Sequence, residues 1–394
     1  MAENYRLMTE NRKKTKILFR HRSMEMGGVE KVMLSLLNNL DREKFEMAVL
    51  LSLNQGELRD DFPKAVRKVF LAKGREDLSK NPLIQKIQLF LRQRKLARLN
   101  RKPAIIDKEI LKDSYDVEIA MTYNDFPMVL NSSNKNSKKI GWFHSDITVP
   151  KLQPKVPQIL SEIPKFDFFI FGSKQSKDIF AETYPHIKLP PNEILRNPIP
   201  IDEIKSKSMA DIPALQGDKI FVSVNRLHSR KGFHKLISAH AKLITEGFSH
   251  HIYIVGDGEE KANLEEQIKK LKVENTFHLL GTKTNPYPYI KNADYFIMPS
   301  ESEGWPLVIA DALILKKPIL ATNVGGIPEM ITHGKNGYLV NYDEQSLYDG
   351  MKNFLTNPEL LQTIKENLRN SEEMFDNQKI FDKIESILIE LAQK

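Results

Sequence analysis

The chain contains no cysteine, which excludes disulfide bonds, a thiolate nucleophile and a cysteine-based zinc site. It also lacks an apolar run long enough to span a membrane, and its N-terminus lacks the apolar core of a signal peptide. No GxxxxGKS or GxxxxGKT sequence is present, which argues against a P-loop ATPase, and no HExxH or similar cluster indicates a metal site. We therefore expect a cytoplasmic protein without a bound metal.

What the chain does have is length and positive charge. Its 394 residues exceed what one ordinary core accommodates, so two domains are expected. The net charge of +8 favours an anionic partner, either a phosphorylated ligand, a membrane surface or a nucleic acid. Charge alone does not choose among these, but no RNA- or DNA-binding motif accompanies it, so we expect no nucleic-acid partner.

Short apolar runs alternate with longer helical patterns along the whole chain. The strand candidates of the first half are Lys16–Arg20, Phe45–Leu51, Lys68–Leu71, Val117–Met121, Ile140–Phe143, Phe166–Phe171 and Glu193–Leu195. Those of the second half are Ile220–Val224, His251–Val255, Thr276–Leu280, Tyr295–Met298, Ile319–Thr322 and Tyr338–Val340, separated by helical patterns at Phe233–Thr245, Lys261–Leu271, Pro306–Leu315 and Gln345–Leu355. This alternation predicts the α/β class, with doubly wound parallel sheets covered by helices on both faces.

A proline-rich connector between Leu189 and Leu215 divides the chain, because proline forbids a long helix there. We predict an N-terminal domain at 1–200 and a C-terminal domain at 201–376, both Rossmann-like and facing a central cleft. The last segment, 377–394, reads as an amphipathic helix that packs back on the first domain. Ligands of open α/β sheets bind outside the carboxyl ends of the strands, so the loops that follow each strand are the candidate binding segments.

In the stretch SESEGWPLVIADALILKKPILATNVGGIPEM, from Ser300 to Met330, Asp311 is surrounded in sequence by apolar residues. Pro306 suits a first helical position, which leaves the amides of Leu307 and Val308 as free donors for a phosphate. Asp311 lies one turn later on the same face, where it could accept from a sugar hydroxyl, and Glu303 lies in the preceding loop. The structural alternative is that Glu303 caps the helix and Asp311 pairs with a surface lysine.

Two further loops present groups that suit a phosphorylated ligand. In VNRLHSRKG, Arg226 and Lys231 lie between a strand and a helix, where they could neutralise a diphosphate. The alternative is a solvated basic loop. In the first half, Gly27 and Gly28 precede a helix and allow close approach of a ligand to the backbone, although an ordinary turn explains a glycine pair equally well.

The sequence GDGE follows the strand His251–Val255 and resembles part of a dinucleotide fingerprint. The third glycine is missing, with Lys261 in its place, so NAD binding is poorly supported. In GWFHSD, His144 follows the strand Ile140–Phe143 and has the best position of the histidines for contact with a substrate. A satisfied structural histidine is an equally good interpretation of His144 from the sequence.

A basic segment at 82–102 carries apolar residues that could share one helical face. These are Leu83, Ile87, Phe90, Leu91 and Leu99. Such a helix suits the surface of an anionic membrane. The alternative is a surface helix packed on the first domain.

Taken together, these motifs resemble family-4 retaining glycosyltransferases of the GT-B type. The resemblance is strong in the second half, through VNRLHSRKG, VGDGE, LLG, ADYFIMPSESEGWPLVIADAL, KKPILATNVGGIPEMI and GKNGYLV, in family order and spacing. It is looser in the first half, through MGGVEKVMLSLLNNL, GWFHSD and LRNPIPID.

The resemblance implies transfer of a sugar from a nucleotide donor, UDP- or GDP-linked, to an acceptor hydroxyl of a glycan or glycolipid, with retained anomeric configuration. It implies no metal and no cofactor, and synthesis of a cell-surface glycan such as lipopolysaccharide, capsule or teichoic acid. The implied catalytic residues are Arg226 and Lys231 on the diphosphate, Glu303 on the donor sugar and His144 beside the transferred sugar. The implied donor-binding residues are Gly28, Asp257, Gly258, Thr282, Leu307, Val308 and Asp311, the last on the ribose.

One departure bears on these roles, because the second acid of the family's E-x7-E element is Asp311 instead of glutamate. Because aspartate is shorter than glutamate, a non-catalytic protein that binds a nucleotide-sugar is an alternative to the transferase. A sugar-nucleotide epimerase or hydrolase on the same architecture is the other alternative.

Overall fold

The computed structural model describes residues 14–144, 147–148 and 150–394, which form two compact units. The first comprises the described residues up to Pro198 together with Asn377–Lys394, and the second comprises Ile199–Asp376. The division therefore lies two residues before the boundary predicted from the sequence, and the segment after residue 376 is part of the first unit. Within the described residues, no helix has the length and apolar character needed to cross a membrane.

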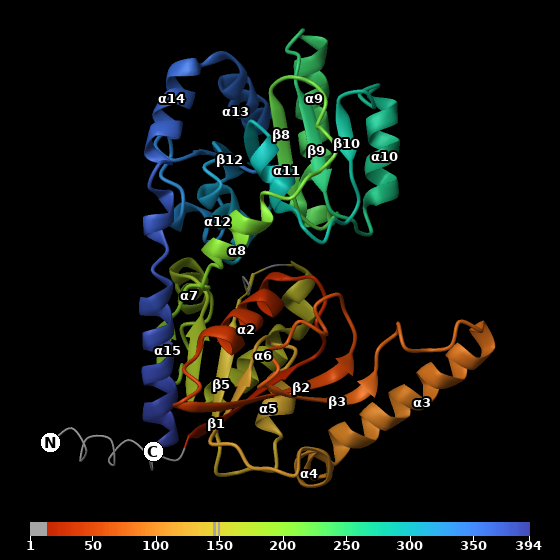
Figure 1. Ribbon diagram of the computed structural model, residues 1–394, viewed down its shortest axis with the longest axis vertical. Helices are drawn as coiled ribbons and strands as arrows, with labels where there is room; N and C mark the ends of the chain where they lie inside the picture. Colours follow the sequence, from red (N-terminus) through yellow and green to blue (C-terminus); the bar gives the residue numbers. More distant parts are fainter. Residues whose placement is uncertain (1–13, 145–146, 149) are drawn as a thin grey trace, which may run out of the picture. The chain divides into compact units, whose positions relative to one another are not determined.

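The first unit contains a seven-stranded sheet with the order β3-β2-β1-β4-β5-β6-β7, and every pair in it is parallel (Figure 1). Its strands are β1 (Thr15–His21), β2 (Phe45–Asn54), β3 (Arg67–Lys73), β4 (Val117–Ala120), β5 (Lys138–Phe143), β6 (Phe168–Phe171) and β7 (Asn192–Ile194). Its helices are α2 (Gly28–Asn39), α3 (Pro82–Arg101), α4 (Pro103–Ile105), η1 (Ile106–Leu111), α5 (Phe126–Leu130), η2 (Pro150–Lys155), α6 (Val156–Glu162), η3 (Ile163–Lys165), α7 (Lys174–Thr183) and α15 (Asn377–Ala392). Strands such as β4 are buried along their whole length, as expected for a parallel sheet covered on both faces.

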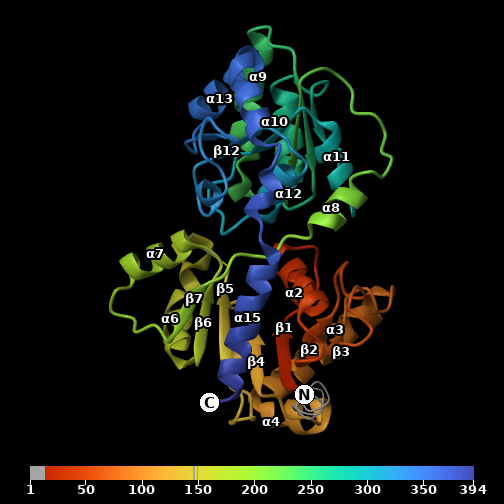
Figure 2. The ribbon, with the colours of Figure 1, turned by 60° about the vertical axis from the view of Figure 1, so that its left-hand side comes forward.

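The C-terminal helix α15 packs along the sheet of the first unit, next to β1 and β4 (Figure 2). Its apolar face, including Ile384 and Leu388, is buried. At its edge, Glu385 accepts from the backbone N–H of Asp41 at 2.8 Å and from Lys44 Nζ at 2.7 Å. Apolar burial and two specific polar contacts thus fix α15 to the first unit, although α15 follows the whole second unit in sequence.

The second unit contains a six-stranded parallel sheet with the order β10-β9-β8-β11-β12-β13. Its strands are β8 (Ile220–Val224), β9 (His251–Val255), β10 (Phe277–Leu279), β11 (Tyr295–Met298), β12 (Ile319–Thr322) and β13 (Tyr338–Val340). Its helices are α8 (Ile201–Lys207), η4 (Ser229–Lys231), α9 (Phe233–Thr245), α10 (Lys261–Lys270), α11 (Tyr287–Asn292), α12 (Leu307–Ile314), η5 (Ile327–Glu329), α13 (Glu344–Thr356), α14 (Pro358–Asn367) and η6 (Ser371–Met374).

These two sheets confirm the predicted fold class, and strands occur at all the positions predicted from the apolar runs. Two details of the helices were wrong. Pro306 is the N-cap of α12 with an extended ψ of 111°, so the helix begins at Leu307 and not at the proline. Leu99 is 5 % exposed and packs in the core, so it does not share the exposed face of Leu83.

The strand order fixes where loops can gather around a ligand. In the second sheet, β8 is followed in sequence by β9 on one side, while β11 lies on its other side. The connections leave β8 and β11 toward opposite sides, so their carboxyl ends form the topological switch point at which open α/β sheets bind ligands. In the first sheet, β1 and β4 form the equivalent point.

Candidate active site

An ion pair stands at the switch point of the second unit. Lys231 ends η4, in the loop after β8, and Glu303 lies in the loop after β11. Lys231 Nζ lies 2.7 Å from Glu303 Oε1, and these side chains are only 17 % and 10 % exposed. Among the predicted catalytic residues, the structure therefore brings Lys231 and Glu303 into direct contact.

Glycine at position 232 makes this contact possible. Gly232 has a φ of +69°, and a Cβ built on it would lie 1.9 Å from the carbonyl oxygen of Pro299. The backbone N–H of Glu301 also donates to the carbonyl oxygen of Arg230 at 2.7 Å. The loops after β8 and β11 are thus held together backbone to backbone, which only a residue without a side chain permits at position 232.

The glycine pair of NVGG, Gly325 and Gly326, contacts the backbone of the loop that carries Glu303. A Cβ on Gly325, whose φ is +58°, would lie 2.0 Å from the carbonyl oxygen of Glu303. The backbone N–H of Gly326 donates to the carbonyl oxygen of Gly304. Because both glycines approach the backbone of the Glu303 loop, they fix the direction from which the Glu303 carboxylate reaches Lys231.

Helix α12 starts directly after this loop and presents an uncapped positive end. Its N-cap is Pro306, and no side chain within the described part of the chain caps it. The amides of Leu307 and Val308 precede the first N–H that has a backbone acceptor, that of Ile309. This arrangement suits an anion, since the first amides of a helix lack intrahelical acceptors and carry the positive end of the helix dipole.

Asp311 lies one turn into α12 and is only 6 % exposed. The pKa of the Tyr287 hydroxyl, in α11, is raised mainly by burial. The negative charges of Asp311 and Glu203 raise this pKa further. The Asp311 carboxylate therefore lies inside the unit, and its contact with a ribose stays a prediction.

Arg226 contacts a different carboxylate from the one that pairs with Lys231. Its side chain is 72 % exposed, and its Nη2 lies 3.4 Å from Glu259 Oε2. The loop of Glu259 packs against that of Arg226, since the backbone N–H of Leu227 donates to the carbonyl oxygen of Asp257 at 3.0 Å. Gly258 is needed there, because its Cβ would lie 2.3 Å from the carbonyl oxygen of Leu227.

The predicted nucleotide contacts Asp257 and Thr282 lie in neighbouring loops. Asp257 Oδ1 accepts from the backbone N–H of Gly258 at 2.7 Å, and its Oδ2 lies 3.5 Å from Lys261 Nζ. Thr282 is exposed and follows the bridge between Gly256 and Gly281. Their roles stay predictions, because no contact joins either side chain to Lys231 or Glu303.

Gly28 is the first residue of α2 in the first unit, at the switch point of that sheet. Glu30 lies against the preceding glycine, since a Cβ on Gly27 would lie 2.3 Å from Glu30 Oε2. Glu30 Oε1 lies 3.3 Å from His21 Nε2, and His21 Nδ1 lies 2.8 Å from Asp125 Oδ2. Burial lowers the pKa of His21, but Asp125 and Glu30 outweigh it and raise this pKa to about 10.

His144 follows β5 at the same edge of the first sheet and stacks on Trp142 with ring centroids 5.3 Å apart. Its Nε2 is buried and finds no hydrogen-bond partner among the described residues. Burial, together with the charge of His21, lowers the pKa of His144 to about 3, so the ring is neutral near pH 7. Ser145 and Asp146 of the same motif lie outside the described residues.

Sequence reasoning missed two parts of these loops. Arg230 contacts the loop after β11 through its carbonyl and places its Nη1 3.5 Å from Ser302 Oγ. The adjacent basic residues of HSRKG were a signal for it. The pairing of His21 with Glu30 and Asp125 had no such signal, because Asp125 lies 104 residues away in sequence. Within the described residues, no group of three or more acidic or histidine side chains is placed to hold a metal ion.

Part of the chain is similar in sequence to known proteins. Residues 205–371 match the family "Glycosyl transferases group 1". Over 219 residues, the chain is 32 % identical to the N-acetylgalactosamine-N,N'-diacetylbacillosaminyl-diphospho-undecaprenol 4-alpha-N-acetylgalactosaminyltransferase of Campylobacter jejuni, covering 55 % of this chain and 58 % of the relative. Over 180 residues, it is 30 % identical to the N-acetyl-alpha-D-glucosaminyl L-malate synthase of Bacillus anthracis, covering 45 % and 47 %. The chain spans about half the length of these curated relatives.

Solved structures extend the likeness to both units. HepE of Anabaena, solved in complex with UDP, superposes with a TM-score of 0.70 at 19 % identity. The superposition covers 95 % of this chain and 100 % of that one. At this identity the likeness establishes the fold, which is GT-B.

Proposed function

We propose that the protein is a retaining glycosyltransferase, because residues 205–371 match the group 1 glycosyltransferase family and the chain has the GT-B fold. It transfers a sugar from a nucleotide-diphosphate-sugar to an acceptor hydroxyl during synthesis of a bacterial cell-surface glycan. The observation that carries this proposal is the contact of 2.7 Å between Lys231 and Glu303 at the switch point of the second unit. It gives one cation for a phosphate and one carboxylate for sugar hydroxyls within a single small region.

The donor, a UDP- or GDP-sugar, binds across the loops after β8 and β11. Its diphosphate accepts from Lys231 Nζ and from the amides of Leu307 and Val308, which point out of an uncapped helix start. Asp311, one turn further along α12, accepts from the ribose hydroxyls. The complex of HepE with UDP supports a uridine nucleotide, and no metal or cofactor takes part in the proposal.

Charge development explains why these groups accelerate transfer. As the glycosidic C–O bond breaks, the anomeric carbon becomes cationic and the diphosphate gains negative charge, which Lys231 and the start of α12 stabilise. Donor binding draws Lys231 toward the phosphate and frees the Glu303 carboxylate for the sugar hydroxyls. The departing phosphate takes the proton of the acceptor hydroxyl, whose oxygen attacks the anomeric carbon from the same face. Arg226 contributes once its side chain leaves Glu259.

The acceptor is a glycan or glycolipid, and the protein acts in the cytoplasm at the inner face of the membrane. The Campylobacter jejuni relative supports a glycolipid acceptor, because its name includes diphospho-undecaprenol. Gly28 and His144 belong to the first unit, and their contacts with donor and acceptor stay predictions.

The test is nucleotide release from a panel of UDP-, GDP-, ADP- and TDP-sugars, with and without lipid-linked acceptors. We expect acceptor-dependent turnover that falls by about a hundredfold or more in Lys231→Ala, because one preorganised charge contact is lost at the leaving group. Lys269→Ala, in an exposed lysine of α10, is the matched control and should leave turnover unchanged.

Two results would replace the proposal by its alternatives. Conversion or hydrolysis of the donor at full rate without any acceptor indicates an epimerase or hydrolase. Donor binding without turnover of any kind indicates a nucleotide-sugar-binding subunit. Turnover that is unchanged in an Arg226→Ala/Lys231→Ala variant would show that the donor lies elsewhere.

A further inference from the structure

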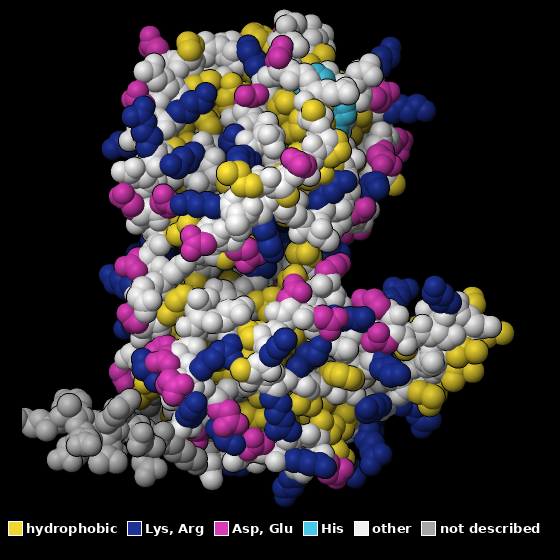
Figure 3. Space-filling model, in the orientation of Figure 1, with side chains coloured by type: hydrophobic (Ala, Val, Ile, Leu, Met, Phe, Trp, Pro, Cys, Tyr) yellow, Lys and Arg dark blue, Asp and Glu magenta, His cyan; other side chains and the backbone are white. Residues whose placement is uncertain are grey.

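Helix α3 carries five of the nine large hydrophobic side chains that are exposed among the described residues. The exposed side chains are those of Leu83 (76 %), Ile84 (48 %), Ile87 (60 %), Phe90 (56 %) and Leu91 (58 %). In Figure 3 they form the apolar end of the helix that projects from the first unit. A cluster of this kind, as opposed to single scattered residues, marks an interaction surface.

The two faces of α3 have different roles. One face packs on the domain: Gln88 Oε1 accepts from the backbone N–H of Ser79 at 2.8 Å, Arg92 Nη1 donates to the carbonyl oxygen of Lys73 at 3.3 Å, and Leu99 is buried in the core. The opposite face therefore points to solvent. Since residues three or four apart share a helical face, this outer face is apolar in its first half and basic in its second half.

The basic half of the outer face consists of exposed cations: Arg94, Lys95, Arg98 and Arg101. The guanidinium of Arg94 lies over the Phe90 ring at 5.6 Å, which joins the two halves. Between Leu78 and Ile106, the sequence contains eight lysine and arginine residues and no aspartate or glutamate. The cations of this face thus have no acidic neighbour within their own segment.

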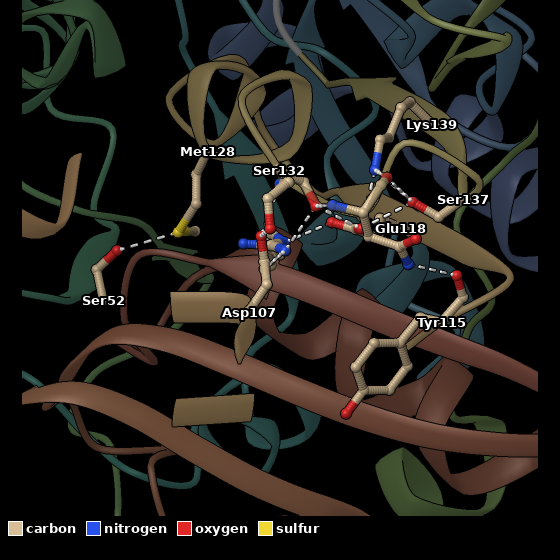
Figure 4. Close-up of polar contacts among 11 residues, drawn as sticks. Ser52, Asp107, Tyr115, Glu118, Met128, Ser132, Ser137 and Lys139 are labelled. Atoms are coloured by element: carbon tan, nitrogen blue, oxygen red, sulfur yellow. Dashed lines mark hydrogen bonds and ion pairs between the residues drawn. The ribbon is translucent and has the colours of Figure 1, made fainter. Parts of the chain in front are cut away.

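The base of α3 is fixed to the sheet by a buried ion network, part of which is shown in Figure 4. Asp107 of η1, just after α3 and α4, accepts from Arg20 Nη2 at 2.6 Å and from the backbone N–H of Ser133 at 2.7 Å. Arg20 Nε also donates to Glu118 Oε2 at 2.7 Å. Because charged partners buried in this way are costly to separate, the network anchors the segment that follows α3 to the sheet.

We propose that the outer face of α3 is a docking surface for an anionic lipid bilayer. The apolar half, around Ile87 and Phe90, enters the boundary between headgroups and acyl chains, and the basic half contacts the lipid phosphates. The order of apolar then basic residues along one face suits a flat surface whose interior is apolar and whose headgroups are negative. This inference is independent of the donor site.

Charge and apolarity together select the bilayer over other occupants. A second copy of the chain, pairing α3 with α3, would bring the same cations against each other, and like charges facing across an interface are unfavourable. An acidic protein would complement Arg94 and Arg98 but leaves the five exposed apolar side chains without a matching surface. Only an anionic bilayer satisfies both halves at once.

The experiment is co-sedimentation of the full chain with vesicles of phosphatidylcholine alone or of an equal mixture of phosphatidylcholine and phosphatidylglycerol. Two triple variants remove the two halves: Leu83→Ser/Ile87→Ser/Phe90→Ser and Arg94→Gln/Lys95→Gln/Arg98→Gln. Two variants outside α3 control for exposed residues of the same kind: Met209→Ser/Leu271→Ser and Lys269→Gln/Lys270→Gln/Arg369→Gln.

We expect binding to the anionic vesicles only, weakened about tenfold or more by each α3 variant and unchanged by the controls. High salt should reproduce the effect of the basic variant, because it screens the headgroup charge. A Phe90→Trp variant reports insertion directly: its fluorescence should shift to the blue with anionic vesicles, whereas that of Met209→Trp should not.

The proposal is overturned if the wild-type chain does not sediment with the anionic vesicles, or if it does so equally well in both α3 variants. It is also overturned if the chain is a dimer that the Leu83→Ser/Ile87→Ser/Phe90→Ser variant dissociates while vesicles are not bound. In that case the face is a contact between two copies. All variants change exposed side chains, so the circular dichroism and Tm of each should match those of the wild type.

Discussion

Gly232 and Gly247 flank the same helix, α9, and their replacement by alanine tests how the Lys231–Glu303 pair is held. Both have a left-handed backbone, with φ of +69° and +88°. A Cβ at position 232 meets the carbonyl oxygen of Pro299 at 1.9 Å and the ring of Tyr342 at 2.9 Å, whereas a Cβ at position 247 meets nothing within 4 Å. The two variants therefore share the backbone penalty and differ in the clash.

The shared penalty is about 1 kcal/mol, the cost of a left-handed conformation for a residue with a side chain. Gly247→Ala should lose only this. Gly232→Ala should lose about 2 kcal/mol more, because the loops after β8 and β11 must separate by about 1 Å or more to relieve the overlap. The entropy that alanine removes from the unfolded chain is the same in both variants and cancels in the comparison.

The same separation stretches the contact of 2.7 Å between Lys231 and Glu303. We therefore expect Gly232→Ala to bind the donor at least about tenfold more weakly, and Gly247→Ala to bind it as the wild type does. Urea titration measures the loss in the free energy of unfolding, and calorimetry measures donor affinity. Equal destabilisation of the two variants, or full donor affinity in Gly232→Ala, would refute the proposed role of the loop contact.

Three further predictions follow from buried titratable groups. Burial lowers the pKa of His240 to about 2 and that of His250 to about 4. Both values lie below about 6.5, the pKa of histidine in the unfolded chain. Below about pH 6.5, the unfolded state therefore binds more protons than the folded state. Urea titrations should thus show stability that falls from about pH 7 to about pH 5, and a flat profile would contradict the burial of both rings. Asp107→Asn should lower the free energy of unfolding by about 3 kcal/mol, because it leaves Arg20 buried with one carboxylate fewer, and a loss well under 1 kcal/mol would be inconsistent with the ion network. Asp311→Asn should weaken nucleotide binding about tenfold or more, because a charge-assisted hydrogen bond to the ribose is lost. Calorimetry measures this affinity, and an unchanged value would show that Asp311 does not bind the donor.

The sheets were predictable because a strand buried on both faces is a continuous apolar run. The run at Phe168–Phe171, for example, is strand β6 over its whole length. The strand ends moved by a few residues, since the sequence does not show where backbone pairing stops. Helix α14 was missed altogether, because its Pro358 and polar residues resemble a connector.

The candidate site was predictable where its residues are adjacent in sequence to the strand ends. Lys231 and Glu303 each follow a strand, and parallel strands bring such loops to one edge. The direction of a side chain was not predictable in this way, as Arg226 shows by turning toward Glu259. Leu99 shows the same limit on α3, because the face that packs on the domain contains Gln88 and Arg92 as well as leucines.

The most direct test of the donor site is a crystal structure of the chain with a bound nucleotide-diphosphate-sugar. We predict that its pyrophosphate contacts Lys231 Nζ and the amides of Leu307 and Val308, with the ribose on Asp311 and the sugar hydroxyls on Glu303. A nucleotide bound away from the loops after β8 and β11, with the Lys231–Glu303 contact undisturbed, would contradict the account.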